Sequence, residues 1–388
     1  MVLRVANVIE EGKLGGPQIR IMRVAAALIG RVDTLVVMSR DNSGAFYEKC
    51  VALGIPCRVI ALTRITREWR VAIAYVALFP SEVIKLARLF RCERIDLVHA
   101  SGGSWQIKAV IASQLAGIPC VWHLNDTLMP GWIRWLFRAV QPLAAGFIYT
   151  GQRVKEYYGR YVTNNRPSAI VQPPVDIHEY DPESPPCVDE EPADLFGDGF
   201  VIGTIGNVNP VKGIETIIRA AALLNNSGRF VRVVVIGPVF QRQRHYADHL
   251  KVLADQVGLN DICFLGGRAD VRPILKRVDV YVCASLSESW GMSLWEAMAM
   301  AKPVVSTDVG DVARYVVDGE SGFVVPVEDS EAMAERIGRL IDSPELRQRI
   351  GHAARNLAAE FSPENIADKT LEIYDRVLAS SRCRGLRP

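Results

Sequence analysis

Seven residues separate two glutamates, Glu288 and Glu296, near the middle of the second half of the chain. The run before them, Val278 to Ala284, is rich in Val, Tyr and Cys and lacks Pro and Gly, which predicts a buried parallel strand. The run from Met292 to Ala301 has the Leu, Ala and Met content of a helix. Glu288 therefore falls in the loop between strand and helix, and Glu296 in the first turns of the helix.

The start of this helix, Gly291 with Met292 and Ser293, offers free backbone amides and the positive end of a helix dipole. A helix start of this kind is a good binding place for an anion or for sugar hydroxyls. A carboxylate only accepts hydrogen bonds, so vicinal hydroxyls are the natural partners of Glu288 and Glu296. The alternative is that Glu296 is a solvated helix residue and Glu288 a charge at a helix N-terminus.

Lys212 precedes Gly213 at a predicted helix start, after a predicted strand from Phe200 to Gly206. An ammonium group at this place would neutralise a diphosphate and the negative charge that develops on a leaving group. A solvated lysine at a helix start is the alternative. The glycine spacing is not G-x-G-x-x-G, which disfavours a dinucleotide site.

Gly15 and Gly16 lie between a first predicted strand, Leu3 to Ile9, and a helical run from Gln18 to Leu28. Adjacent glycines at a strand-to-helix turn allow backbone amides to touch a diphosphate. The pair also fits a turn without function, because Gly-rich turns occur throughout α/β proteins.

Two histidines end predicted strands. His123 ends the strand that starts at Cys120, so we expect it at the carboxyl edge of a sheet, where open α/β domains bind ligands. His99 ends a neighbouring strand and either lines an acceptor pocket or is packed at the strand end. His245 and His249 share a helix face without the glutamate of a zinc-protease motif, which indicates a solvated face.

No metal site is expected. The eight cysteines are scattered without a C-x-x-C pair, which favours reduced thiols in the cytosol over a disulfide framework or a zinc site. Asp308 and Asp311 are too widely spaced to act as a D-x-D pair that holds Mg²⁺ or Mn²⁺ on a diphosphate.

Apolar strand runs alternate with helical runs in both halves, which predicts two α/β domains with parallel sheets. We expect an N-terminal Rossmann-like domain over residues 1–175 and a second one over residues 199–360. Residues 176–198 are rich in Pro, Asp and Glu and are predicted to be a linker. Residues 361–388 are expected to form a helix, from Glu364 to Leu378, that packs back on the first domain.

Charge and composition narrow the class of protein. The chain has 388 residues and a net charge of +2, which divides into +9 for residues 1–180 and −7 for the remainder. A basic first half favours binding to an anionic surface. No apolar run is long enough to span a membrane, and acidic Glu10-Glu11 follows the first strand without a secretory pattern, so we expect a cytoplasmic protein.

Glu288 through Val305 resembles the signature of the retaining GT-B glycosyltransferases of the "glycosyl transferases group 1" family. That signature runs E-x-F-G-x-x-x-x-E-A-x-A-x-G-x-P-V, and this chain has Glu296-Ala297-Met298-Ala299 followed by Lys302-Pro303-Val304-Val305. Trp290 replaces the usual Phe, and Ala301-Lys302 replaces a small residue and Gly. The resemblance implies two Rossmann-like domains that face a central cleft.

The family implies roles for these residues. Glu296 would hold ribose hydroxyls, and Glu288 with the amides of Gly291, Met292 and Ser293 would hold the donor sugar. Lys212 and the Gly15-Gly16 amides would hold the diphosphate, and His123 would contact the sugar. The segment around Lys212 is similar to the family's G-R-L-x-P-x-K-G, but Asn207 stands where the family usually has Arg. Arg268 or an arginine of the N-terminal domain is the candidate cation to compensate.

The resemblance implies transfer of a hexosyl group from a nucleotide-diphosphate sugar to a hydroxyl acceptor, with retention of configuration and without metal or cofactor. The expected setting is synthesis of a cell-envelope polysaccharide or glycolipid, with a carbohydrate or lipid-linked acceptor and no nucleic acid. Two alternatives share the fold, a nucleotide-sugar epimerase or phosphorylase and a catalytically inactive nucleotide-sugar-binding subunit. Asn207 favours the inactive subunit.

The segment Trp132-Ile133-Arg134-Trp135-Leu136-Phe137-Arg138 mixes aromatic and basic residues as interfacial helices do. Together with the basic first half, it predicts a peripheral contact with the inner face of a membrane. The alternative is a buried helix, because Trp132, Trp135 and Leu136 also follow core-like helical spacing.

Overall fold

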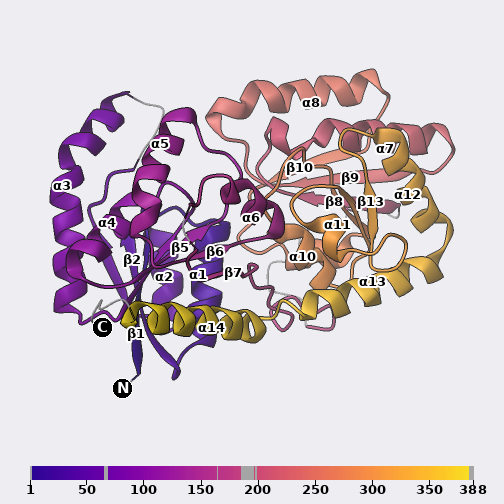
Figure 1. Cartoon of the computed structure of the whole chain (residues 1–388). Coiled ribbons are helices and arrows are strands. Elements are labelled where there is room, and N and C mark those ends of the chain that lie inside the picture. The colour runs from indigo at the N-terminus through magenta and orange to yellow at the C-terminus, as the bar shows by residue number, and fades with distance from the viewer. Residues whose placement is uncertain (1, 65–68, 164, 185–195, 197–198, 384–388) are drawn as a thin grey trace. The chain divides into compact units, whose positions relative to one another are not determined.

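The computed structural model describes residues 2–64, 69–163, 165–184, 196 and 199–383, and it divides into two compact units (Figure 1). Unit 1 comprises Met1–Pro174 and Pro363–Pro388, and unit 2 comprises Val175–Ser362. The predicted linker, residues 176–198, lies partly outside the described residues. Cys187 is among the residues that are not described.

Unit 1 contains, within its described residues, a seven-stranded parallel sheet in the order β3-β2-β1-β4-β5-β6-β7. The strands are β1 (Leu3–Ile9), β2 (Val32–Ser39), β3 (Cys57–Ile60), β4 (Leu97–Ser101), β5 (Cys120–Leu124), β6 (Gly146–Tyr149) and β7 (Ser168–Ile170). Strand β7 was not predicted, because three residues beside Pro167 give no periodic signal of their own and are ordered by pairing with β6.

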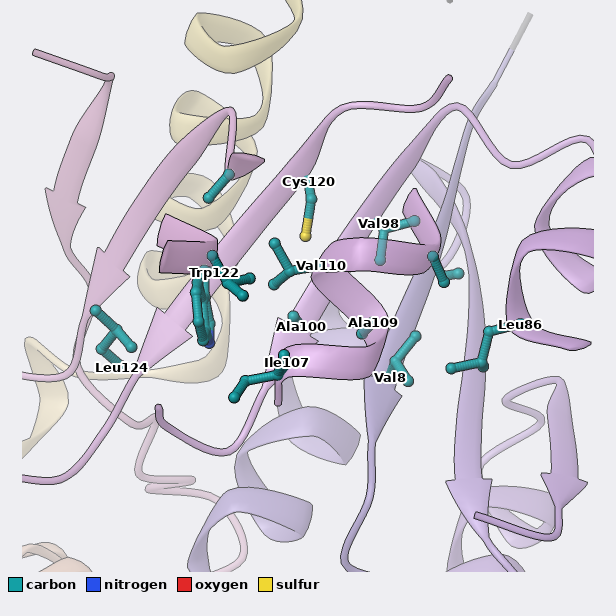
Figure 2. Close-up of a cluster of buried hydrophobic side chains, with 14 of the residues drawn as sticks. Val8, Leu86, Val98, Ala100, Ile107, Ala109, Val110, Cys120, Trp122 and Leu124 are labelled. Carbon is teal, nitrogen blue, oxygen red and sulfur yellow. The ribbon is translucent and has the colours of Figure 1, made fainter. Parts of the chain in front are cut away.

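Helices cover both faces of this sheet, because parallel strands need crossover connections. They are α1 (Gly16–Ala27), α2 (Gly44–Ala52), α3 (Trp69–Cys92), α4 (Ile107–Ala116), α5 (Gly131–Val140), α6 (Gln152–Gly159) and α14 (Pro363–Arg382), with a 3₁₀ turn at Gln141–Leu143. One core packs α3, α4 and α5 on the sheet through Trp122 and its neighbours (Figure 2). Helix α14 packs against α1 and β6, where Gly146 leaves room for Val377.

Unit 2 contains, in its described part, a six-stranded parallel sheet in the order β10-β9-β8-β11-β12-β13. Its strands are β8 (Phe200–Ile205), β9 (Val231–Ile236), β10 (Ile262–Gly266), β11 (Val280–Cys283), β12 (Val304–Thr307) and β13 (Phe323–Val325). Its helices are α7 (Ile214–Asn226), α8 (Arg244–Gln256), α9 (Arg272–Arg277), α10 (Met292–Ala299), α11 (Val312–Tyr315), α12 (Ser330–Asp342) and α13 (Pro344–Ala359), with 3₁₀ turns at Pro210–Lys212 and Gln241–Gln243. The prediction of two parallel α/β sheets is confirmed.

Both sheets reverse their strand order at one point, between β1 and β4 in unit 1 and between β8 and β11 in unit 2. The loops that follow the two strands at such a point leave in opposite directions and open a crevice at the carboxyl edge of the sheet. Each unit therefore has one topologically favoured place for a ligand.

A buried charged cluster lies beside this point in unit 1. Lys108 of α4 is fully buried, 2.6 Å from a carboxylate oxygen of Glu82 on α3 and 3.5 Å from one of Glu10, which directly follows β1. The Lys108 ammonium also donates to Thr63 and lies 4.0 Å from the ring centroid of Tyr75. The cluster therefore ties the ends of β1 and β3 to α3 and α4.

One ammonium group faces two carboxylates in this cluster. Burial raises the pKa of Glu10 to about 7, although the Lys108 charge opposes that shift. The other Glu10 oxygen, Oε1, is buried without a hydrogen-bond partner among the described residues. Glu10 therefore takes up a proton near neutral pH more readily than an exposed carboxyl does.

We expect Glu10→Gln to lose less stability than the wild type when the pH rises from 6 to 8. A carboxyl whose folded pKa exceeds its unfolded pKa stabilises the fold below the unfolded value, here 4.5, and this stability is lost as pH rises toward 7. The free energy of unfolding of wild type relative to Glu10→Gln should fall by about 1 kcal/mol between pH 6 and 8. Urea denaturation at both pH values measures it, with exposed Glu364→Gln as control. A difference that is constant with pH contradicts the assignment.

Ala301 adopts a φ of +54°, in the left-handed region that favours glycine, two residues after the end of α10. In the family signature from Glu296 onward, E-A-x-A-x-G-x-P-V, this is the position of Gly. We expect Ala301→Gly to stabilise the protein by about 0.5 to 1 kcal/mol, because relief of the left-handed penalty exceeds the added entropy of the unfolded chain. In contrast, Ala297→Gly inside α10 should destabilise by about 1 kcal/mol or more. Calorimetric melting of both variants tests this, and a lower melting temperature for Ala301→Gly refutes it.

Candidate functional site

The crevice of unit 2 brings two predicted site residues together. Lys212 lies in the loop after β8 and Glu288 in the loop after β11, which are the two strands at the reversal point. The Lys212 ammonium is 2.5 Å from Glu288 Oε1, and both side chains are only partly buried. Ser285 Oγ donates to the same carboxylate oxygen at 3.0 Å. The pair is thus fixed in place and still reached by solvent.

The environment keeps Lys212 charged. Burial lowers its pKa, the adjacent Glu288 carboxylate raises it, and the net result lies above the usual value for lysine. A cation held by one carboxylate at a crevice can exchange that partner for a phosphate oxygen, because both are anionic acceptors.

Backbone geometry explains how Lys212 reaches this position. Asn209 caps the 3₁₀ turn by accepting a hydrogen bond from Val211 N. Gly213 then adopts a φ of +58°, and a Cβ at this position would lie 2.1 Å from the Ala284 carbonyl oxygen. At Gly206 a Cβ would meet the Lys212 side chain at 2.6 Å. Gly213 is therefore required for the close approach of the two loops, and Gly206 leaves room for the Lys212 side chain.

The start of α10 lies at the end of the same loop. Gly291 precedes the helix with a φ of +75°, and no side chain caps the helix among the described residues. Ser293 Oγ lies 2.8 Å from the Tyr281 hydroxyl and donates to the Ile205 carbonyl, so it joins α10 to β8 and β11. Met292 is half-buried. The first-turn amides are consequently free of side-chain caps, as an anion site requires.

Glu296 lies one turn further along α10 and is 8% exposed. Behind the loop, Trp290 and Trp295 stack with ring centroids 4.7 Å apart, and Phe361 packs edge-on against both. Trp295 Nε1 donates to the Trp290 carbonyl. The Trp that replaces the usual Phe is therefore part of an aromatic cluster that supports the loop.

The other two predicted donor-side residues of unit 2, Asn207 and Arg268, lie in the loops after β8 and β10. Asn207 lies two residues after the end of β8 and is exposed. Arg268 follows β10, at the outer edge of the sheet and two strands away from β8. Its guanidinium is exposed and donates to the carbonyls of Leu265 and Gly267 in its own turn. Arg268 thus lies at the same carboxyl edge as Lys212, two strands away along the sheet.

In unit 1, Gly15 and Gly16 lie at the N-terminus of α1, in the loop that leaves β1 at the reversal point. Gly15 is extended and Gly16 begins the helix, and no side chain caps it among the described residues. Both glycines are half-buried. The arrangement leaves backbone amides at the carboxyl edge of the sheet in unit 1.

His123 lies within β5, and both of its ring nitrogens are engaged inside unit 1. Nδ1 is 3.2 Å from His99 Nε2, and Nε2 is 3.2 Å from Thr150 Oγ1. His99 in turn lies 2.6 Å from the Tyr374 hydroxyl of α14. Burial and the nearby Arg20 charge hold the pKa of both imidazoles well below the usual value, so both are neutral at pH 7. His99 is thus packed at the end of its strand. His123 could contact a sugar only if one of its two hydrogen bonds opened.

The remaining sequence predictions concern metal and membrane. His245 and His249 are exposed on α8, in agreement with a solvated face. Across the residues that the structure describes, no group of three or more His, Cys, Asp or Glu could hold a metal ion. None of the helices within the described residues has the length and apolar character needed to cross a membrane.

The sequence analysis missed several residues that shape these sites. Ser285 orients Glu288, and Gly206 makes room for Lys212, but neither has a distinctive spacing. The cluster of Glu10, Glu82 and Lys108 had one signal, a lysine within the otherwise apolar helical run of α4. A charge in such a run suggests a buried partner, although its identity depends on the fold.

Family models match most of the chain. The model "Glycosyl transferases group 1" matches residues 189–357, and "Glycosyltransferase Family 4" matches residues 14–179. Among relatives, the lipopolysaccharide core biosynthesis mannosyltransferase LpcC of Rhizobium leguminosarum bv. viciae is 30% identical over 284 residues, which cover 68% of this chain and 80% of LpcC. The putative glycosyltransferase EpsD of Bacillus subtilis is 31% identical, over 46% of this chain and 45% of its own length. The match therefore spans less than half of EpsD.

Solved structures agree on the fold. Anabaena Alr3699/HepE, solved with UDP and glucose, superposes with a TM-score of 0.80 at 22% identity and covers 96% of this chain and 99% of its own. A glycosyltransferase from Rickettsia africae superposes with the same score at 18% identity, over 97% of this chain and 99% of its own. With the matches of sequence, motif and fold in agreement, the chain belongs to the glycosyl transferases group 1 family of GT-B glycosyltransferases.

Proposed function

We propose that the protein transfers a hexosyl group from a nucleotide-diphosphate sugar to a hydroxyl acceptor with retention of configuration, in synthesis of a cell-envelope polysaccharide or glycolipid. The observation that supports this most is the Lys212–Glu288 pair at the crevice of unit 2, beside the uncapped start of α10. Cation, helix amides and carboxylate together suit a diphosphate attached to a polyhydroxylated sugar. The names of LpcC and of the capsular polysaccharide glycosyltransferase CapM of Staphylococcus aureus support the setting.

In this proposal Lys212 exchanges its contact with Glu288 for an oxygen of the donor diphosphate. Its ammonium then offsets the charge that grows on the diphosphate as the bond to the anomeric carbon breaks. The amides of Gly291, Met292 and Ser293 add neutralisation without metal. Released from Lys212, Glu288 accepts hydrogen bonds from hydroxyls of the donor sugar, while Ser285 keeps the carboxylate oriented.

Glu296 would accept hydrogen bonds from the ribose hydroxyls of the donor nucleotide. Alr3699/HepE was solved with UDP and with UDP-glucose, which supports a nucleotide-sugar donor for this chain. Retention is what the family implies. No residue of the sequence stands out as a nucleophile, so we expect same-face attack instead of a covalent intermediate. The acceptor hydroxyl would form its bond to the anomeric carbon on the face that the diphosphate leaves, and its proton would pass to the departing phosphate oxygen.

The acceptor is proposed to be a carbohydrate or a lipid-linked glycan, reached by a protein that binds the cytoplasmic face of the membrane peripherally. Unit 1 would hold it, at the crevice between β1 and β4. The basic first half of the sequence supports this orientation toward anionic lipid.

One observation favours a second candidate function, a catalytically inactive nucleotide-sugar-binding subunit. Asn207 is exposed where the family usually has Arg, and Arg268 follows β10, two strands away from β8. Titration with a panel of nucleotide sugars followed by a donor hydrolysis assay separates the two. Binding without any turnover, with every acceptor class tried, would favour the inactive subunit.

Lys212→Ala and Glu296→Ala should each lower kcat/KM for the donor severely. Loss of a charged group that hydrogen-bonds the ligand costs about 2 to 4 kcal/mol, or roughly thirtyfold to a thousandfold. Steady-state kinetics with the donor identified by the nucleotide-sugar screen measures it. Lys251→Ala on the exposed side of α8 is the matched control and should leave kcat/KM unchanged. Wild-type kcat/KM in both folded site variants would remove the site assignment.

Activity should persist in EDTA, because Lys212 and backbone amides supply the charge that a divalent cation would supply elsewhere. The assay compares initial rates in EDTA, after dialysis, and after addition of Mn²⁺ or Mg²⁺. Rates that agree within about twofold meet this expectation, since removal of a catalytic metal costs far more. Complete loss of activity in EDTA that Mn²⁺ restores would contradict the mechanism.

A further inference from the structure

Helix α5 exposes its largest apolar side chains. Trp135 is 74% exposed, and Trp132 and Leu136 are also exposed, whereas Ile133 and Phe137 face the core. The alternative that the tryptophans and Leu136 form the buried face is therefore wrong. Exposure of two tryptophans on one short helix is unusual for a surface that faces only water.

Helix α3 shows a second exposed apolar stripe. Ile73, Val76 and Ile84 are all exposed, with Val76 at 72%, and they follow helical spacing along one side of the helix. The next turns on the exposed side hold the cations Lys85 and Arg88. This arrangement of an apolar stripe continued by cations was not recognised in the sequence.

The only acidic residue of α3, Glu82, is turned inward onto Lys108. Helix α5 has no acidic residue, and its Arg134 and Arg138 are exposed. The exposed sides of the described parts of α3 and α5 therefore carry cations and apolar groups without a carboxylate. A surface of that kind complements a partner that is apolar and anionic at once.

The two helices belong to one layer. Helix α4 packs against both α3 and α5, and the three share a core against the same face of the sheet. Figure 1 draws them together on that side of unit 1. Because the core faces point to the sheet, the exposed faces of α3 and α5 point away from it on the same side.

We propose that α3 and α5 form a docking surface for an anionic lipid bilayer, made of Ile73, Val76 and Ile84 of α3 with Trp132, Trp135 and Leu136 of α5. Tryptophan prefers the headgroup level of a bilayer, aliphatic side chains enter its acyl boundary, and arginine and lysine contact lipid phosphates. This inference rests on the proposed function only in its choice of a lipid-linked acceptor. The docking itself follows from the exposed residues.

The position of the surface suits delivery of a lipid-linked acceptor. The Trp132 ring packs edge-on against Trp105 at 5.9 Å, and Trp105 lies in the loop after β4. That loop borders the crevice of unit 1. The docking surface and the proposed acceptor side are therefore neighbours within one unit.

Vesicle flotation tests the proposal with the full chain and two vesicle compositions, pure phosphatidylcholine and phosphatidylcholine with about one third phosphatidylglycerol. We expect binding to the anionic vesicles at low salt and a steep decrease as salt screens the cations. Trp132→Ser/Trp135→Ser and, separately, Ile73→Ser/Val76→Ser should each weaken the partition coefficient by about tenfold or more. Phe230→Ser removes a 78% exposed aromatic ring in unit 2 and should leave the partition coefficient unchanged.

The docking surface is refuted if the wild-type protein stays with the unbound fraction at low salt. It is also refuted if Phe230→Ser weakens binding as much as the double variants do, or if both double variants bind as the wild type does. A dimer in analytical ultracentrifugation that dissociates in Trp132→Ser/Trp135→Ser would identify a second copy of the chain as the occupant instead. Donor hydrolysis in solution distinguishes this failure from failure of the proposed function, because the double variants should retain hydrolysis at the wild-type rate.

Discussion

The strand order of each sheet is the constraint on which the candidate sites depend. In unit 2 the chain builds outward from β8 to one side and then returns to place β11 on the other side. The loops after β8 and β11 consequently diverge, and Lys212 and Glu288 meet across the gap. Gly213 allows this contact, because any Cβ there would collide with the Ala284 carbonyl. The chemistry proposed for the crevice thus depends on the close approach of two backbone segments, at Gly213 and Ala284.

The two crevices use charge differently. In unit 2 the Lys212–Glu288 pair is partly solvated, so a donor phosphate can replace the carboxylate at modest cost. In unit 1 the pairs of Lys108 with Glu10 and Glu82 are buried, where removal of Lys108 would leave two carboxylates without a cation. The first arrangement suits exchange with a ligand, and the second suits a fixed framework for the loops that begin at Glu10 and Thr63.

Burial also explains which sides of α3 and α5 are exposed. Each helix supplies one apolar side to the core, and Glu82 is drawn inward by Lys108. What remains outside on α3 is a second apolar stripe and its cations. The helices thus have two apolar sides, of which the core accounts for one.

The sequence by itself determined the strands, the alternation of strands and helices, and the loop positions of Lys212, Glu288 and Gly291, because these depend on local apolar runs and on glycine. The short strand β7 escaped it, since only pairing with β6 orders those three residues. Tertiary structure alone decided that His123 bonds His99 and Thr150, that Lys108 lies between two carboxylates, and that Trp135 faces outward. Each of these depends on which distant side chains share a buried volume, and periodicity along one segment does not contain that information.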